Sequence, residues 1–116
     1  MIRTALRSWL IVVAIALFAV SHSYSEPRVI EITCQKSVYK PDVIRVKKGE
    51  PLRLVITTND VLHGFAIDEF NIAKEVAPGR PLTLDLTPDR TGEFIFYCVV
   101  RCGKQHRQMR GKLIVE

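Results

Sequence analysis

From about residue 28 onward, the sequence is a series of short apolar segments separated by proline and glycine turns. Apolar residues alternate with polar ones in Leu82–Leu86, and β-branched residues enrich Leu52–Thr58; both patterns indicate strands. About seven short strands, with no helix of useful length, predict a single all-β sandwich. The expected strands are Arg28–Gln35, an extended Val38–Val46 broken at Lys40-Pro41-Asp42, Leu52–Thr58, Gly64–Ile67, Leu82–Leu86, Phe94–Tyr97 and Lys112–Glu116, while Asp68–Ala77 has room for one short helical turn.

The N-terminal segment differs from the rest and has the pattern of a secretory signal. Arg3 and Arg7 form a positive start, and Trp9–Val20 forms an apolar run of twelve residues. That run is shorter than the roughly 20 apolar residues that span a bilayer. We therefore expect a cleaved signal peptide in residues 1–25, with an uncleaved anchor as the alternative, and an exported, periplasmic or otherwise extracytoplasmic domain in residues 26–116.

Charge and cysteine content narrow the class of protein further. The net charge is +5, two of these charges lie in the predicted signal, and no run of five basic residues occurs. This small surplus gives no reason to expect nucleic-acid binding. Three cysteines in an exported chain cannot all pair with one another. Cys98 and Cys102 lie four residues apart on one expected loop, which favours a metal site, whereas Cys34 lies in an expected strand and is interpreted as a small buried hydrophobic residue.

The loop that follows Phe94–Tyr97 holds two thiols, one imidazole and one thioether within twelve residues. Copper prefers sulfur and imidazole donors, whereas Mg²⁺ and Ca²⁺ prefer oxygen. A second imidazole, His63, lies upstream beside another expected strand. We interpret the chain as a small β scaffold that holds copper between two loops. The candidate side-chain donors are His63, Cys98, Cys102, His106 and Met109.

Three other interpretations remain open on the residues alone. The donor spacing also fits one face of an amphipathic helix, although Gly103 and the few apolar residues argue against it. A Cys98–Cys102 disulfide is chemically feasible outside the cytoplasm when copper is absent. Two thiolates and two imidazoles would suit zinc, although the thioether of Met109 is a poor zinc ligand and a common copper ligand.

The order of the donors resembles a known copper family. The run Cys98-x3-Cys102-Gly103-x2-His106-x2-Met109, with Asp60-Val61-Leu62-His63-Gly64-Phe65 upstream, is similar to the dicopper CuA segments of cytochrome c oxidase subunit II. The resemblance extends back to about residue 29, so it covers essentially the whole expected mature chain. It implies a cupredoxin-like Greek-key β-sandwich.

The same resemblance implies a ligand set for two copper ions. Cys98 and Cys102 would bridge the two ions as thiolates. His63 and Met109 would complete one copper, and His106 with the main-chain carbonyl of Val100 would complete the other. The family usually has glutamate at the position of Val100, and a backbone ligand tolerates that change of side chain.

The implied function is electron transfer rather than catalysis by the chain itself. Two thiolates shared by two coppers spread one electron over both ions, so the bonds change little on reduction, and a rigid scaffold helps. Neither a nucleophile–base pair nor a carboxylate pair is evident in the sequence. The alternatives are a periplasmic copper chaperone or storage protein that uses the same ligands, and a mononuclear blue-copper protein in which one cysteine would be surplus.

Basic residues in the donor loop bear on the partner. Exposed charge beside a redox centre steers the approach of other proteins. We expect a redox partner with an acidic or neutral contact face, a monomeric chain, no nucleic acid, and membrane contact only through a retained N-terminal segment. Solvated charges with no partner role are the alternative. The residues are Arg101, Lys104, Arg107 and Arg110.

Overall fold

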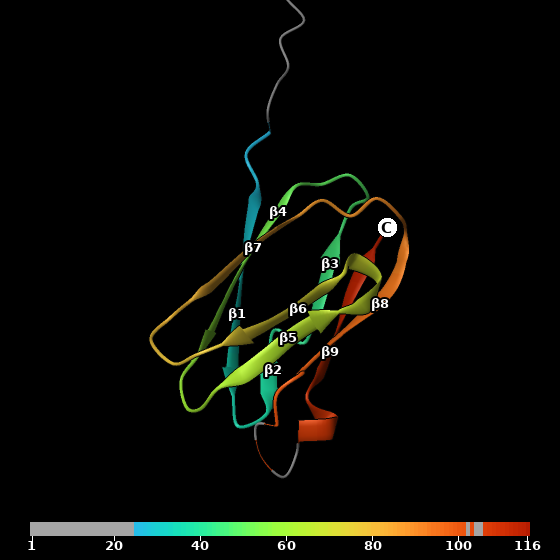
Figure 1. Ribbon diagram of the computed structural model, residues 1–116. Coiled ribbons are helices and arrows are strands. Elements are labelled where there is room, and N and C mark those ends of the chain that lie inside the picture. Colours follow the sequence, from blue (N-terminus) through green and yellow to red (C-terminus); the bar gives the residue numbers. More distant parts are fainter. Residues whose placement is uncertain (1–24, 102, 104–105) are drawn as a thin grey trace, which may run out of the picture.

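The computed structural model describes residues 25–101, 103 and 106–116. Nine strands form two sheets, one in the order β2-β1-β4-β7 and the other in the order β3-β9-β8-β5-β6 (Figure 1). The elements are β1 Arg28–Gln35, β2 Val38–Lys40, β3 Val43–Val46, β4 Leu52–Thr58, β5 His63–Ile67, η1 Asp68–Phe70, β6 Ile72–Val76, β7 Leu82–Leu86, β8 Gly92–Tyr97, η2 His106–Gln108 and β9 Arg110–Val115, where η denotes a 3-10 turn.

The all-β class is confirmed, and the strand count differs from the expected seven in two places. The extended region 38–46 is two strands, β2 and β3, which pair in different sheets on either side of Pro41. Proline has no N–H to continue a ladder, so the chain changes sheets there. Strand β6 was not expected, because it lies at the sheet edge and buries only Val76 fully. With only one fully buried residue, the strand leaves no alternating apolar pattern in the sequence.

Two parallel pairings bring strands from distant parts of the chain together. Strand β1 runs parallel to β4, with Ile32 opposite Ile56, and β3 runs parallel to β9. Inward-facing residues of both sheets are buried, and several of them, such as Leu54 and Phe65, are at most 1% exposed. Each such side chain contributes about 1.5–3 kcal/mol by burial. The sandwich is therefore held by contacts between segments far apart in the sequence.

A cluster of three aromatic rings joins the two sheets. Tyr39 of β2 contacts Phe65 of β5 and Phe96 of β8 edge-on, with ring centroids 6.0 and 5.1 Å away. The rings of Phe65 and Phe96 lie 5.2 Å apart. Such aromatic pairs stabilise a core beyond the area they bury. The cluster packs against the start of β5, where His63 lies.

Three connections meet at one end of the sandwich, the lower end in Figure 1, opposite the β3–β4 turn: the β1–β2 turn, the β4–β5 connection and the β8–β9 segment. The Asn59 N–H donates to the Cys34 carbonyl at 3.2 Å, and the Gly64 N–H donates to Cys98 Sγ at 3.2 Å. The candidate donors thus belong to this end of the sandwich. In the ranges that the structure describes, no helix has the length and apolar character needed to cross a membrane.

Candidate metal centre

His63 is the first residue of β5, and its side chain is fully buried. Its Nε2 atom lies 2.7 Å from Oδ1 of Asp60. Its Nδ1 atom is also buried and has no hydrogen-bond partner among the described residues. A buried polar atom without a partner costs about 1–3 kcal/mol, so it requires an explanation. A metal ion bound to the Nδ1 lone pair would supply one, and in this respect His63 fits the implied copper.

Asp60 contacts the His63 ring at Nε2, and its own carboxyl group is fixed by further hydrogen bonds. Its Oδ1 accepts hydrogen bonds from the Val61 N–H at 2.7 Å and the Thr58 hydroxyl at 3.1 Å, and its Oδ2 accepts from the Lys36 N–H at 2.7 Å. Burial raises the pKa of this carboxyl, but the hydrogen bonds from Lys36, Val61, His63 and Thr58 outweigh that effect and hold the pKa well below its ordinary value. Asp60 is therefore an ionised hydrogen-bond acceptor.

Cys98 directly follows β8 and is 4% exposed. Its Sγ accepts the Gly64 N–H from β5 and donates to the Val100 carbonyl oxygen at 2.9 Å. Its own N–H donates to the Met109 carbonyl at 3.3 Å. The structure therefore places the thiol of Cys98, the carbonyl of Val100 and the residue that follows His63 in direct contact.

Gly64 allows this close approach between the two loops. A Cβ atom at this position would lie 2.5 Å from Val99 Cγ2 and 2.6 Å from Val99 N. Real Cβ atoms do not approach other atoms so closely, and a backbone nitrogen cannot rotate away as a side chain can. A glycine after His63 is thus what lets Cys98 and Val100 reach the start of β5.

His106 begins the short turn η2, and Met109 directly follows it. Met109 is 1% exposed, and its N–H donates to the His106 carbonyl at 3.2 Å. His106 begins η2, is half-buried, and donates its N–H to the Gly103 carbonyl at 3.2 Å. The spacing of the donors would also have fitted an amphipathic α-helix. In the described part of the loop, the structure has only the short 3-10 turn η2, so that interpretation is wrong there.

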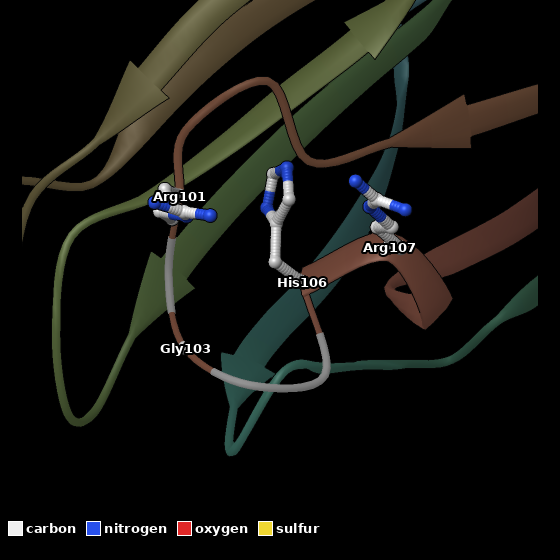
Figure 2. A pocket seen from close by; sticks show the side chains of 4 residues that line it. All are labelled: Arg101, Gly103, His106 and Arg107. Carbon is white, nitrogen blue, oxygen red and sulfur yellow. The ribbon is translucent and has the colours of Figure 1, made fainter.

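An open pocket of about 770 Å³ lies beside His106, and its described lining residues are Arg101, Gly103, His106 and Arg107. Figure 2 shows the His106 ring between the side chains of Arg101 and Arg107. The mouth of the candidate centre is therefore positively charged. Apolar residues are exposed on the adjoining connections, namely Val61 at 47%, Leu62 at 36% and Val99 at 42%.

Five of the six predicted ligands thus lie at one end of the sandwich, and the sixth, Cys102, lies outside the described residues. Among the residues that the structure describes, no three His, Cys, Asp or Glu side chains group as a metal site by themselves. The ligand set therefore stays a prediction. Sequence reasoning assigned no role to Asp60, although its position three residues before His63 was a usable signal. Cys34 is fully buried in the core, as expected.

Comparisons with known proteins show which families and proteins this chain is similar to. A family model described as a cupredoxin-like domain matches residues 8–115. A cytochrome c oxidase subunit 2 of Thermus thermophilus is 38% identical over 78 residues, which cover 67% of this chain and 58% of that protein. A nitrous-oxide reductase of Cupriavidus necator is 32% identical over 91 residues, covering 75% of this chain and 14% of that protein. The chain thus spans little more than half of the first relative and far less of the second.

Solved structures share the fold. The periplasmic domain of subunit II of cytochrome oxidase from Bradyrhizobium japonicum superimposes with a TM-score of 0.72 at 21% identity, covering 79% of this chain and 86% of that one. Reduced auracyanin from Roseiflexus castenholzii superimposes with a TM-score of 0.63 at 18% identity, covering 79% of this chain and 99% of that one. At these identities the likeness concerns the two-sheet architecture alone.

Proposed function

Because this chain belongs to the cupredoxin-like domain family, we propose that it is an electron-transfer protein that binds copper at the loop end of its sandwich. One observation carries the proposal. The buried Nδ1 of His63 has no described hydrogen-bond partner, and the next residue along, Gly64, donates to the thiol of Cys98. A soft donor and a borderline donor therefore come together from two connections, which suits copper. The oxidase and nitrous-oxide reductase names of the relatives support the same function.

The proposed centre is binuclear and of the CuA type. Cys98 and Cys102 would bridge two coppers, which His63, Met109, His106 and the Val100 carbonyl would complete. The contact of Cys98 with both Val100 and Met109 supports this assignment. When bound, copper supplies a one-electron couple. The chain holds His63, Cys98 and Met109 at the ends of paired strands and keeps water from them, since they are at most 4% exposed. Both effects keep rearrangement small.

Metal analysis with electron paramagnetic resonance tests the type of centre. We expect two coppers per chain and hyperfine splitting from two equivalent nuclei in the oxidised protein. Cys98→Ser should abolish that spectrum, while Cys34→Ser, which changes a buried thiol in the β1 framework, should retain it. Splitting from one nucleus would replace the binuclear centre by a mononuclear blue site. Zinc in place of copper in the isolated protein would overturn the proposal.

Burial of the thioether favours electron transfer over copper delivery. Met109 is the one methionine in the described part of the chain, and it is 1% exposed. Proteins that hand over Cu(I) need accessible donors that exchange readily. We expect the loaded protein to cycle reversibly at an electrode and to keep its copper when mixed with a thiol-rich Cu(I) acceptor. Rapid loss of copper to that acceptor would favour a chaperone or storage protein.

The charged pocket beside His106 supports a partner with an acidic or neutral contact face. Electrostatic steering raises association rates and weakens as salt rises. Arg107→Glu should slow electron exchange with an acidic partner about tenfold at low salt. Lys48→Glu, in the β3–β4 turn at the opposite end, should leave that rate unchanged. Equal rates with acidic and basic partners would contradict this assignment.

Export and processing also remain proposals. Residues 1–24 lie outside the described residues, so the structure has no bearing on the signal peptide proposed for residues 1–25 or on an uncleaved anchor. The description of the Bradyrhizobium domain as periplasmic supports an exported protein. N-terminal sequencing of the protein from periplasmic and membrane fractions would distinguish a cleaved monomer in the periplasm from an anchored one.

A further inference from the structure

We propose that Asp60 is a positioning residue that determines which nitrogen of His63 binds copper. The proposal rests on the copper site proposed above and adds a role for a residue outside the ligand set. Asp60 would hold the ring proton on Nε2 and so leave the Nδ1 lone pair for the metal.

The hydrogen bond between the two side chains has a defined direction. Both carboxyl oxygens of Asp60 accept hydrogen bonds from backbone N–H groups, Oδ1 from Val61 and Oδ2 from Lys36, so Nε2 of His63 is the donor across the 2.7 Å contact with Oδ1. A neutral imidazole carries one ring proton, and the other nitrogen then holds a lone pair. That other nitrogen is Nδ1, the buried atom without a described partner. The contact with Asp60 thus selects the tautomer in which the buried nitrogen is free to act as a ligand.

Hydrogen bonds from other residues fix the carboxylate of Asp60 in place. Its carboxylate accepts from Thr58 at the end of β4, from Val61 in the β4–β5 connection and from Lys36 in the β1–β2 turn. These donors come from two segments that are distant in the sequence. A carboxylate fixed by three donors cannot rotate away from His63 without losing them. The ring orientation is therefore set by the scaffold before any metal binds.

The β1–β2 connection is a two-residue hairpin turn between the paired residues Gln35 and Val38, and such turns adopt positive φ at both central positions. Lys36 and Ser37 have φ values of 51° and 58°, in the left-handed region that favours glycine or asparagine. Backbone held in that region persists only where the surrounding structure requires it. The Lys36 N–H, at this turn, is the group that reaches Asp60 Oδ2. The turn therefore presents a donor to the carboxylate that orients His63.

A carboxylate behind a ligating histidine also changes the donor strength of the ring. Loss of a hydrogen-bond partner behind a ligating histidine typically lowers metal affinity by about 10–100-fold. A carboxylate that served only to fold the β4–β5 connection would not alter the tautomer of His63 or the properties of a bound metal. Those two properties therefore separate a positioning role from a purely structural one.

The first experiment needs no variant. Nitrogen-15 chemical shifts of the His63 ring in metal-free wild-type protein report which nitrogen carries the proton. We expect the proton on Nε2 at neutral pH. A proton on Nδ1 would overturn the proposal. Because this measurement uses protein without copper, it remains decisive even if the chain were to bind no metal and the proposed function failed.

The second experiment compares Asp60→Asn with Asp85→Asn. Asp85 pairs with Arg53 in an exposed ion pair between β7 and β4, so its variant makes the same chemical change at a different place. We expect Asp60→Asn to bind copper about 10–100-fold more weakly and to raise the reduction potential, because a weaker donor stabilises Cu(II) less. Asp85→Asn should match wild type in both. An Asp60→Asn protein that is less stable but keeps the affinity and potential of wild type would overturn the proposal. If Asp60→Asn does not fold, the wild-type ring shifts decide the question.

Discussion

The two connections that carry the candidate ligands differ in how much of their geometry the scaffold supplies. The β4–β5 connection presents one ligand, His63, which is fully buried and hydrogen-bonded to Asp60. The β8–β9 segment carries the other described candidates, Cys98, Val100, His106 and Met109, and His106 is half-buried beside an open, positively charged pocket. One side of the centre is thus built into the sandwich, while the other combines the buried donors Cys98 and Met109 with one ligand, His106, that borders solvent.

This difference indicates a division of labour. Burial and a fixed tautomer at His63 favour an unchanging bond to the metal, which lowers the rearrangement that accompanies electron transfer. A half-buried ligand at the mouth of a charged pocket lies where a partner protein could approach. The two sides meet at Gly64, whose N–H contacts Cys98 and whose carbonyl contacts Tyr39.

The largest effect is expected from adding a methyl group where the two sides meet. Gly64→Ala would force a Cβ to within 2.6 Å of Val99 N, and Gly111→Ala in β9 would overlap the ring of Phe96. Both variants should lower the free energy of unfolding by about 1–3 kcal/mol, or more where nothing yields. Only Gly64→Ala should also change the copper spectrum, because it displaces the backbone next to Val100. Denaturant titration and absorption spectra measure the two effects, and an unaltered spectrum in Gly64→Ala would break the comparison.

Replacing each histidine by alanine in metal-free protein tests which side of the candidate centre is already ordered by the scaffold. In metal-free protein, His63→Ala should lower the free energy of unfolding by about 1–2 kcal/mol, since the cavity and the lost partner of Asp60 outweigh the removal of the buried, unpartnered Nδ1. His106→Ala, at a half-buried position, should lower it by less than about 0.5 kcal/mol. Urea denaturation of both variants gives the two values. Equal losses would show that the two sides do not differ in the way described.

The hydroxyl of Tyr39 offers a smaller and cleaner change. It donates to the Gly64 carbonyl at 2.6 Å in the buried interior and so ties β2 to the start of β5. Tyr39→Phe keeps the ring cluster and should cost about 1 kcal/mol of unfolding free energy. Tyr97→Phe removes a hydroxyl that donates to Asp68 at 2.6 Å at the surface, and should cost less than half as much. A thermal melt of each variant compares them, and the opposite order would contradict the prediction.

The smallest effect concerns the β1–β2 turn. Lys36→Gly removes a left-handed penalty of about 1–2 kcal/mol and adds about 0.5–1 kcal/mol of chain entropy cost, so it should stabilise the protein by up to about 1 kcal/mol. The Lys36 N–H remains, so the copper affinity should stay at the wild-type value. Denaturant midpoints and copper titration check both parts. A change in affinity would mean that the lysine side chain contributes to the site.

The two-sheet class was predictable because alternating burial leaves a period of two in strands such as β7. Strand β6 was not predictable, because an edge strand with one buried residue leaves no such period. The split of 38–46 into two sheets depends on partners far along the chain, β1 for β2 and β9 for β3. Local patterns report burial, but they do not report which segment provides it.

For the candidate centre, the sequence by itself determined the donor chemistry, because the identity and order of Cys98, His106 and Met109 are local facts. Only the tertiary structure decided that His63 is fully buried, that Asp60 binds its Nε2, and that the donor behind Asp60 is the Lys36 N–H. Those contacts join residues from separate connections. Hydrogen bonds of that kind leave no periodicity or spacing in the chain, so they become visible only when the two sheets have brought the connections together.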